Sequence, residues 1–342
     1  MVHRLVAWMH SDRYPTWSIP SDSLRRLSDV AGPDWEVESI PIVAKASGDG
    51  VETVPDEVLA AVADAEIYMG FGVPAVVLRR GPNLRWVHSA AAGVRSSLTA
   101  EMKASGVLFT NSAGVYGRPL AEWAIGAILY FARGFDLAAG PADPWPFDAS
   151  ACSSSPLREV GGSRVAVIGY GGIGREIGRL AAALGMNVTA VRARPDQPLP
   201  EEADRVFGTD RLPEAVSDAH YVVLALPETA GSVGLFGKEA LAAMRSDAVL
   251  LNVARGSIVD EAALVAALRR GSLRGAALDV FRREPLPADS PLLELSNVLA
   301  TPHTGSVSPR FWERQTALMA ENLARFLRGE TLVNLVDKHR GY

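Results

Sequence analysis

Residues 163–174 read Ser-Arg-Val-Ala-Val-Ile-Gly-Tyr-Gly-Gly-Ile-Gly, and this stretch decides the fold class. The apolar, β-branched run at 165–168 is typical of a buried parallel strand. It leads directly into the pattern Gly169-x-Gly171-x-x-Gly174, and an alanine-rich helical segment follows. Such glycines provide a tight turn, room for a pyrophosphate and close helix–strand packing, while the N-terminus of the next helix attracts phosphate. The stretch therefore predicts a dinucleotide-binding strand–turn–helix unit.

The composition of the 342-residue chain indicates a globular protein with two domains. Hydrophobic residues make up 48% and charged residues 21%, and the net charge of −5 is interspersed, so we expect no nucleic-acid partner. The single cysteine, Cys152, excludes an intrachain disulfide and favours a cytoplasmic location. The apolar run at residues 5–9 is too short for a signal peptide, and no run approaches the roughly 20 apolar residues that cross a bilayer. The absence of such a run predicts no membrane partner. The six histidines show no metal-ligand spacing, so we expect no metal.

Short apolar runs alternate with helical patterns along most of the chain, which predicts parallel α/β sheets. The expected strands lie at residues 5–9, 35–40, 66–69, 84–88, 107–110, 164–168, 188–191, 221–226, 248–252, 276–280 and 298–300. A long helical pattern at 120–139 separates the two series, a Pro-, Ser- and Gly-rich connection at 140–162 follows it, and a last helix is expected at 311–327.

The nucleotide motif begins in the middle of the chain, which predicts one domain inserted into another. We expect two Rossmann-like parallel-sheet domains, one flavodoxin-like and one dinucleotide-binding, with a cleft between them that holds a small substrate. The cofactor domain is expected at residues 117–310. The substrate-binding domain is then discontinuous and consists of residues 1–116 and 311–342.

Four chemically useful side chains lie at or just beyond the ends of expected strands in the second half of the chain. Hydride transfer to a 2-keto acid needs a cation for the carboxylate and an acid for the developing alkoxide, usually a histidine tuned by a carboxylate. Arg255 follows one strand, Asp279 lies at the end of the next with Glu284 just beyond it, and His303 follows the last. Because ligands bind beyond the carboxyl ends of parallel strands, we expect these groups to meet there.

From about residue 84 to the C-terminus the sequence resembles the D-isomer-specific 2-hydroxyacid dehydrogenases, which include glyoxylate/hydroxypyruvate reductases. The motifs that carry this resemblance lie at residues 169–174, 226–229, 252–256, 259–261, 278–281, 284–286 and 302–305.

The resemblance implies a role for each matching residue. Arg255 would bind the carboxylate and carbonyl of the substrate, and the backbone of Ala92, Gly93 and Val94 would also hold the carboxylate. His303 would act as the acid in ketone reduction and the base in alcohol oxidation, and Glu284 would pair with it and fix its tautomer. Asp279 would face the nicotinamide. The expected cofactor-binding set is Gly169, Gly171, Gly172, Ile173, Gly174, Leu226, Pro227, Thr229, Val253, Ala254, Asp279, His303 and Gly305.

Two positions depart from the family pattern. NAD-specific members have an acidic residue at the end of the second strand of the cofactor domain, where this chain has Arg192, with Arg194 two residues later. Guanidinium groups pair with a 2′-phosphate, so NADP(H) is favoured over NAD(H); the alternative is that both arginines are solvated loop charges. Arg95 stands where many relatives have aspartate, and it forms either a surface ion pair or a contact with a second anionic group of the substrate.

The sequence thus predicts an NADP(H)-preferring oxidoreductase that interconverts small 2-keto acids and D-2-hydroxy acids. One alternative is a dehydrogenase for a phosphonate- or phosphate-bearing substrate on the same scaffold. A second alternative is a non-catalytic NAD(H)-sensing module, against which the set of Arg255, Glu284 and His303 argues. Residues 120–131 carry more apolar surface than one buried stripe needs, and relatives dimerise through the cofactor domain, so a homodimer through this helix and the connection at 140–162 is expected.

Overall fold

The computed structural model describes residues 2–11, 15–43, 46–47, 50–51, 53–138 and 157–341. The chain forms two compact units: unit 1 consists of Met1–Tyr116 and Val307–Tyr342, and unit 2 of Gly117–Ser306. Cys152 and most of the connection expected at 140–162 lie outside the described residues.

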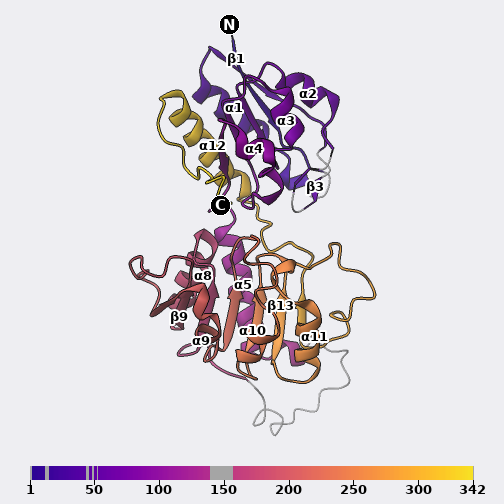
Figure 1. Ribbon diagram of the computed structural model, residues 1–342, viewed down its shortest axis with the longest axis vertical. Helices are drawn as coiled ribbons and strands as arrows, with labels where there is room; N and C mark the ends of the chain where they lie inside the picture. The colour runs from indigo at the N-terminus through magenta and orange to yellow at the C-terminus, as the bar shows by residue number, and fades with distance from the viewer. Residues whose placement is uncertain are drawn as a thin grey trace. The chain divides into compact units, whose positions relative to one another are not determined.

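Unit 1 contains a five-stranded sheet in which all neighbouring strands are parallel (Figure 1). Its strands, in order across the sheet, are β2 (Trp35–Ser39), β1 (His3–Trp8), β5 (Ile67–Gly70), β6 (Trp86–Ser89) and β7 (Leu108–Asn111). The two-residue strands β3 (Ala46–Ser47) and β4 (Gly50–Val51) pair only with each other in the described residues. Without them the strand order is 2-1-3-4-5, the flavodoxin-like order that was predicted.

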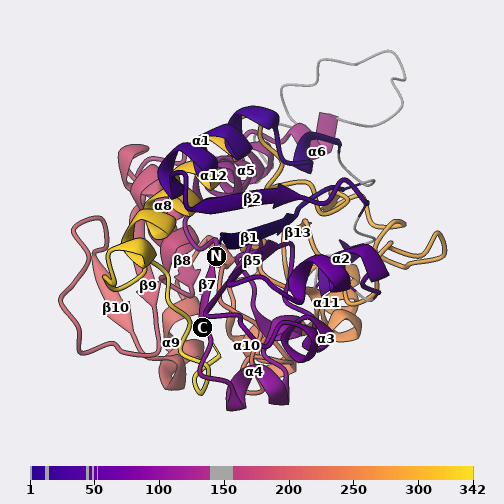
Figure 2. The ribbon, with the colours of Figure 1, turned by 90° about the horizontal axis from the view of Figure 1, so that it is seen from above.

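Both faces of this sheet are covered by helices, as Figure 2 shows. Alternation along β1 sends Leu5 and Ala7 into the core under α1 (Ser21–Ala31) and α12 (Phe311–Leu327). Val6 and Trp8 enter the opposite core. That core lies under α2 (Asp56–Val62), α3 (Ala75–Arg80) and α4 (Ala100–Ala104). The last helix of the chain therefore completes the core of the first unit.

Unit 2 contains a seven-stranded parallel sheet whose central strands are buried. Its strands, in order across the sheet, are β10 (Arg205–Phe207), β9 (Asn187–Val191), β8 (Arg164–Ile168), β11 (Tyr221–Leu224), β12 (Val249–Asn252), β13 (Gly275–Leu278) and β14 (Val298–Ala300). In chain order this is 3-2-1-4-5-6-7, the dinucleotide-binding order with one strand added. The predicted fold class, two parallel-sheet α/β domains, is confirmed.

Helices cover both faces of this second sheet as well. α5 (Gly117–Ala132) packs beside α8 (Gly172–Ala183) on one face. The other face carries α9 (Leu212–Val216), α10 (Lys238–Ala243) and α11 (Glu261–Arg269), whose apolar side chains share a core with the strands. Short 3₁₀ turns occur at Pro15–Trp17, Arg95–Ser97, Thr209–Arg211 and Gly256–Ile258.

The single helix expected at residues 120–139 is wrong in its length and continuity. α5 begins at Gly117 and ends at Ala132, and the short helix α6 (Phe135–Ala138) follows after a break. Gly134 lies in this break with a φ of 68°, a left-handed conformation that interrupts a right-handed helix. The apolar pattern continues across the break, which is why the sequence alone indicates one helix.

The sheet edges and strand ends also differ from the predictions. β10 was not expected, because its three residues form no apolar run. The strands expected at 221–226 and 276–280 end earlier, at Leu224 and Leu278. The residues beyond these ends therefore belong to the loops where ligands bind in such sheets.

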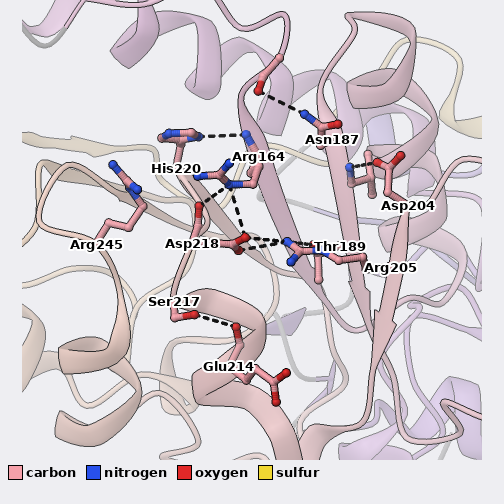
Figure 3. A network of polar contacts seen from close by, with 12 residues as sticks. Arg164, Asn187, Thr189, Asp204, Arg205, Glu214, Ser217, Asp218, His220 and Arg245 are labelled. Carbon is pink, nitrogen blue, oxygen red and sulfur yellow. Dashed lines mark hydrogen bonds and ion pairs between the residues drawn. The ribbon is translucent and has the colours of Figure 1, made fainter.

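A polar network holds the amino ends of three strands of unit 2 together, as Figure 3 shows. Asp218 lies 3.0 Å from Arg205 Nη2, and its carbonyl oxygen accepts a 2.7 Å hydrogen bond from Arg164 Nε. His220 Nδ1 accepts the backbone N–H of Arg164 at 2.9 Å. Burial acts to raise the pKa of Asp218, but its hydrogen bond and attraction to Arg205 lower it below its ordinary value. This network lies at the sheet edge opposite the strand carboxyl ends, so we assign it to the fold.

None of the helices within the described ranges combines the length and apolarity that crossing a bilayer requires.

Candidate functional site

The glycine turn after β8 has two structural glycines and one that leaves space open. Gly169 has a φ of 93°, and a Cβ there would lie 2.5 Å from Leu226 Cα. A Cβ on Gly174 would lie 2.0 Å from Gly169 O, so the strand and the helix approach too closely for any side chain. At Gly171 nothing lies within 4 Å of a Cβ position. The turn therefore leaves open space at Gly171, the position where the motif is expected to admit a pyrophosphate.

The start of α8 fits an anionic group in this open space. The helix begins at Gly172, and the residue before it, Gly171, provides no side-chain cap. The first backbone N–H groups, including that of Ile173, therefore have no partner within the helix and carry the positive end of its dipole. This arrangement fits the pyrophosphate of a dinucleotide.

Arg192 follows β9 directly and has a different environment from Arg194. Its half-buried guanidinium donates from Nη2 to the carbonyl oxygens of Gln197 and Pro198, the latter at 2.9 Å. Arg194 is exposed, and its guanidinium has no hydrogen bond or ion pair to the described residues. Arg192 is therefore not a freely solvated charge, because it binds the loop that carries Arg194.

A carboxylate that the sequence reasoning missed lies near this end of the site. Glu202 Oε1 is 3.6 Å from Arg175 Nε. Burial raises the pKa of Tyr170, and the neighbouring Glu202 raises it further. Because Glu202 is 28 residues beyond Gly174 and far from any motif, no pattern in the sequence indicates it.

The loop after β11 carries the predicted residues Leu226, Pro227 and Thr229. It is held by Ser232, whose hydroxyl donates to the carbonyl of Pro227 at 2.8 Å and accepts the N–H of Thr229 at 2.8 Å. The backbone of Leu226 lies against Gly169. This loop thus borders the glycine turn.

The segment after β12 is rigid around Arg255. Asn252 donates from Nδ2 to the carbonyl of Arg255 at 2.9 Å, and its Oδ1 accepts the N–H of Ala254 at 3.0 Å. Val253 and Ala254 are buried. A Cβ on Gly256 would lie 1.9 Å from the carbonyl carbon of Phe281, so only glycine allows this close approach. The loops after β12 and β13 are therefore in contact beside the half-buried Arg255.

Glu284 and His303 form a direct pair beyond the ends of β13 and β14. His303 Nδ1 lies 2.8 Å from Glu284 Oε2, and Glu284 Oε1 accepts the backbone N–H of Phe281 at 3.0 Å. The side chains are 20% and 24% exposed, so both can be reached from solvent. Because the carboxylate accepts at Nδ1, the other ring nitrogen, Nε2, is the one that can exchange a proton with a ligand.

His303 has an unusual backbone conformation, with a φ of 55°. Left-handed conformations are uncommon for residues other than glycine, asparagine and aspartate, and they concentrate at functional sites. A 2.9 Å hydrogen bond from the N–H of His303 to the carbonyl of Thr301 closes the turn. The turn directs the imidazole to Glu284 at a conformational cost that the surrounding loop must offset.

Asp279, which was expected to face a nicotinamide, binds the loop that carries His303. Its carboxylate is only 1% exposed and accepts hydrogen bonds from Thr301 Oγ1 at 2.6 Å, Thr304 N at 2.9 Å and Gly305 N at 3.0 Å. Burial raises the pKa of Asp279, while these hydrogen bonds act in the opposite direction. Asp279 thus fixes the loop that carries His303. Trp123 contributes from α5 through a 3.1 Å hydrogen bond to Thr301, a contact that no sequence pattern predicts.

The predicted carboxylate loop, Ala92, Gly93 and Val94, lies in unit 1 beyond the end of β6. Asn111 Nδ2 donates to the carbonyl of Ala92 at 2.7 Å. Within the described ranges, no acceptor is found for the backbone N–H groups of these three loop residues. Successive unpaired N–H groups of this kind form an anion-binding concavity. Arg95 follows this loop at the start of a 3₁₀ turn and is exposed.

In the portion of the chain that the structure describes, no three His, Cys, Asp or Glu side chains gather as metal ligands do. The groups described above, taken unit by unit, are backbone N–H groups, guanidinium groups and carboxylates, one of which pairs with an imidazole.

Comparisons with known proteins show which family and fold the chain resembles. The family model described as D-isomer specific 2-hydroxyacid dehydrogenase, NAD binding domain, matches residues 138–305. Glyoxylate/hydroxypyruvate reductase B of Yersinia pestis (strain Pestoides F) is 32% identical over 328 residues, which are 94% of this chain and 95% of that protein. D-3-phosphoglycerate dehydrogenase of Methanocaldococcus jannaschii is 31% identical over 82% of this chain, which spans only 53% of that longer relative.

A solved structure extends the similarity over the whole chain. It is a D-isomer specific 2-hydroxyacid dehydrogenase from Xanthobacter autotrophicus Py2 in complex with NADPH and MES. It matches with a TM-score of 0.78 and 31% identity, and the match covers 100% of both chains.

Proposed function

Because the chain belongs to the D-isomer specific 2-hydroxyacid dehydrogenase family, whose members are NAD(P)-dependent oxidoreductases acting on CH–OH groups, we propose that it is an NADPH-preferring reductase of small 2-keto acids. The product is the corresponding D-2-hydroxy acid. The observation that carries the proposal is the Glu284–His303 pair, in which the carboxylate holds Nδ1 at 2.8 Å. A non-catalytic sensing module has no need of such a pair.

The two units have separate tasks in this proposal. Unit 2 binds the cofactor along the glycine turn and the loops after β11 to β14, and unit 1 binds the substrate carboxylate through residues 92–94. Arg255 provides the cation that neutralises the carboxylate and polarises the keto oxygen. His303, protonated and held by Glu284, donates the proton that the developing alkoxide takes up.

The cofactor supplies a hydride when it is bound. The chain's own residues orient it: the open space at Gly171 and the N-terminus of α8 receive the pyrophosphate. The loop residues Leu226, Pro227 and Thr229 line the same side of the sheet. Asp279 acts here as a positioning residue, because its carboxylate is occupied by the loop of His303.

A direct assay tests the proposal. Purified protein is mixed with NADPH and, in turn, glyoxylate, hydroxypyruvate and pyruvate, and the nicotinamide absorbance is followed. We expect consumption of NADPH with at least one of these acids. If none of the three, nor a wider panel of 2-keto acids, is reduced, the proposal is rejected.

The cofactor preference leads to a prediction for Arg192 and Arg194. Charge-assisted hydrogen bonds of about 1.5–3 kcal/mol each to a 2′-phosphate favour NADPH over NADH by about tenfold to a hundredfold in kcat/KM. Arg192→Asp should weaken NADPH and improve NADH, because the new carboxylate repels phosphate and accepts from ribose hydroxyls. Arg194→Ala should reduce the preference without improving NADH.

The control accounts for the structural role of Arg192. Its guanidinium also binds the carbonyls of Gln197 and Pro198, so the melting temperature of each variant is measured alongside the two efficiencies. Arg211→Ala, which removes an exposed arginine paired with Glu214, should leave the cofactor ratio unchanged. An NADH preference in the unmodified protein contradicts the assignment.

The Glu284–His303 pair leads to a prediction for turnover. The carboxylate of Glu284 binds Nδ1 of His303 at 2.8 Å and so orients the ring that donates the proton. Glu284→Gln removes the charged partner and should lower kcat for the reduction of glyoxylate, by less than the loss of His303 itself, with the KM for NADPH little changed. Steady-state kinetics of both proteins measure this. An unchanged kcat shows that Glu284 does not assist His303.

The proposed protein is a homodimer through unit 2. Of the six apolar residues that motivated this expectation, Ile128 and Phe131 are buried within the unit itself, while Trp123, Ile125, Leu129 and Tyr130 are half-buried. In the following helix, Phe135 and Leu137 are 57% and 61% exposed. Light scattering at micromolar concentration should give twice the chain mass, and Leu137→Glu should reduce it. Leu199→Glu, at another exposed leucine of unit 2, should not; a monomeric parent protein contradicts the proposal.

A further inference from the structure

In unit 1, one buried serine supports the backbone that leads into the loop of residues 92–94, which we call the substrate loop. Ser112, which is fully buried, donates from Oγ to the carbonyl of Ser89 at 3.0 Å. Its backbone N–H donates to the carbonyl of Ala91 at 3.1 Å. Ser112, the first residue beyond the end of β7, thus binds two carbonyls: that of the last residue of β6 and that of Ala91 in the segment that follows.

Two further side chains hold the carbonyls between and after these. Tyr116 donates its hydroxyl to the carbonyl of Ala90, and Asn111 donates from Nδ2 to the carbonyl of Ala92 at 2.7 Å. Four consecutive carbonyls, from residue 89 to residue 92, therefore have donors on the same neighbouring segment, residues 111–116. We call these three residues, Asn111, Ser112 and Tyr116, the loop brace.

The brace determines the direction of the loop N–H groups. In a trans peptide the C=O of one residue and the N–H of the next point in opposite directions. Because the carbonyls of Ala91 and Ala92 are bound to the brace, the N–H groups of Ala92 and Gly93 must point away from it. These are two of the three N–H groups for which no acceptor is found within the described ranges.

A buried histidine links the brace to the C-terminal helix. His88 is fully buried, and its Nε2 lies 3.2 Å from Ser112 Oγ and 2.9 Å from Gln315 Nε2, on α12. Its Nδ1 lies 2.9 Å from Thr110 Oγ1, which also accepts from Trp86 Nε1 at 2.8 Å. Burial lowers the pKa of His88 to about 3, so the ring is neutral at physiological pH. An uncharged network under the loop adds no charge of its own to an anion site.

Burying these polar side chains costs free energy that apolar side chains of the same size do not cost. A role in filling space alone therefore does not explain the network. His88, Thr110, Ser112 and Gln315 are all fully buried, and each loses its hydrogen bonds to water on folding. Apolar residues of similar size fill a core at lower cost. The hydrogen bonds that this network forms favour one geometry, since breaking any of them leaves a further unpaired buried group.

We propose that Ser112 is a positioning residue of the substrate site. Its backbone N–H binds the carbonyl of Ala91 and so turns the N–H of Ala92 toward the carboxylate of the 2-keto acid, while its hydroxyl, bound to the carbonyl of Ser89 and beside His88, fixes the place of that backbone N–H. His88 and Gln315 anchor Ser112 to α12. This inference rests on the proposed function of the loop and adds a residue that touches no ligand. It predicts that the loss of one hydroxyl beneath the loop affects substrate affinity specifically.

The test compares two buried serines of unit 1 in the full-length protein. Ser112→Ala removes the hydroxyl under the loop. Ser23→Ala removes a buried hydroxyl that accepts from Thr316 at 2.6 Å between α1 and α12, away from the loop. For each variant we measure the melting temperature, the KM for glyoxylate, the KM for NADPH, and the hydrogen–deuterium exchange of the amides of residues 92–94.

Ser112→Ala should raise the KM for glyoxylate about tenfold, the effect of one lost hydrogen bond, with little change in the KM for NADPH. Its loop amides should exchange faster than those of the parent. Ser23→Ala should lower the melting temperature comparably and change neither the KM for glyoxylate nor the exchange. Tyr116→Phe, which keeps the ring beside Phe311, should act like Ser112→Ala and serves as the second variant if that protein does not fold.

The outcomes separate this inference from the proposed function. If the parent reduces 2-keto acids but the KM and the exchange respond equally to Ser112→Ala and Ser23→Ala, the positioning role is overturned and the function stands. If the parent reduces no 2-keto acid, the proposed function and the positioning of substrate fail together, and faster exchange then supports only the mechanical part, the brace.

Discussion

Replacing His303 with alanine is expected to lower turnover by roughly 10²–10⁴-fold, the range for loss of a general acid, while the affinity for NADPH stays nearly unchanged. The imidazole of His303 is bound at Nδ1 by the carboxylate of Glu284 and can be reached from solvent. Steady-state kinetics with glyoxylate and fluorescence titration with NADPH measure the two quantities separately.

The backbone of His303 requires a matched variant. Its φ of 55° is costly for alanine, so His303→Ala can move the loop as well as remove the proton donor. Asparagine tolerates the left-handed conformation and has no acidic proton of comparable strength. His303→Asn should therefore lose turnover as His303→Ala does, with the melting temperature of the parent. Turnover near that of the parent in His303→Asn excludes His303 as the acid.

Arg255→Lys is expected to lower kcat/KM for 2-keto acids by about 10²-fold, the scale of a misoriented reactant. Lysine keeps the positive charge but loses the planar fork that pairs with a carboxylate at two points. The carbonyl of Arg255 accepts hydrogen bonds from Asn252 Nδ2 and from the N–H of Ile258, and both remain in the variant because neither involves the side chain. We expect a raised KM for the keto acid and a reduced kcat, with the KM for NADPH little changed.

The comparison for Arg255→Lys is Arg269→Lys. Arg269 is an exposed arginine in the last turn of α11 that pairs with Glu294 at 3.0 Å, so it tests the general effect of the exchange. Its kinetics should equal those of the parent. If Arg255→Lys is equally silent, another cation binds the substrate carboxylate.

Arg255 and His303 show which parts of the site can be predicted from the sequence alone. Arg255 follows an apolar run that is typical of a buried strand, and His303 follows the short apolar run of the edge strand β14. Both are recognisable because parallel strands bring their carboxyl ends to one edge. The glycine turn is recognisable for a similar reason, since Gly169 and Gly174 have no room for a side chain. Local pattern and the geometry of parallel sheets are enough for these features.

Contacts between distant segments could not be read in this way. The burial of Asp279 under Thr301 and the bond from Arg192 to the carbonyl of Pro198 depend on how loops return to the sheet. The break at Gly134 depends on a single φ that the continuous apolar pattern conceals.

By itself the sequence determined the two parallel sheets, the position of the nucleotide motif and the residue types at the strand ends, because these follow from periodicities of a few residues. Only the tertiary structure decided that Glu284 binds the Nδ1 atom of His303. It also decided which backbone carbonyls Ser112 binds. The reason is physical: a hydrogen bond needs two groups within about 3 Å in a suitable orientation, and for groups far apart in the chain only the packed fold sets that distance.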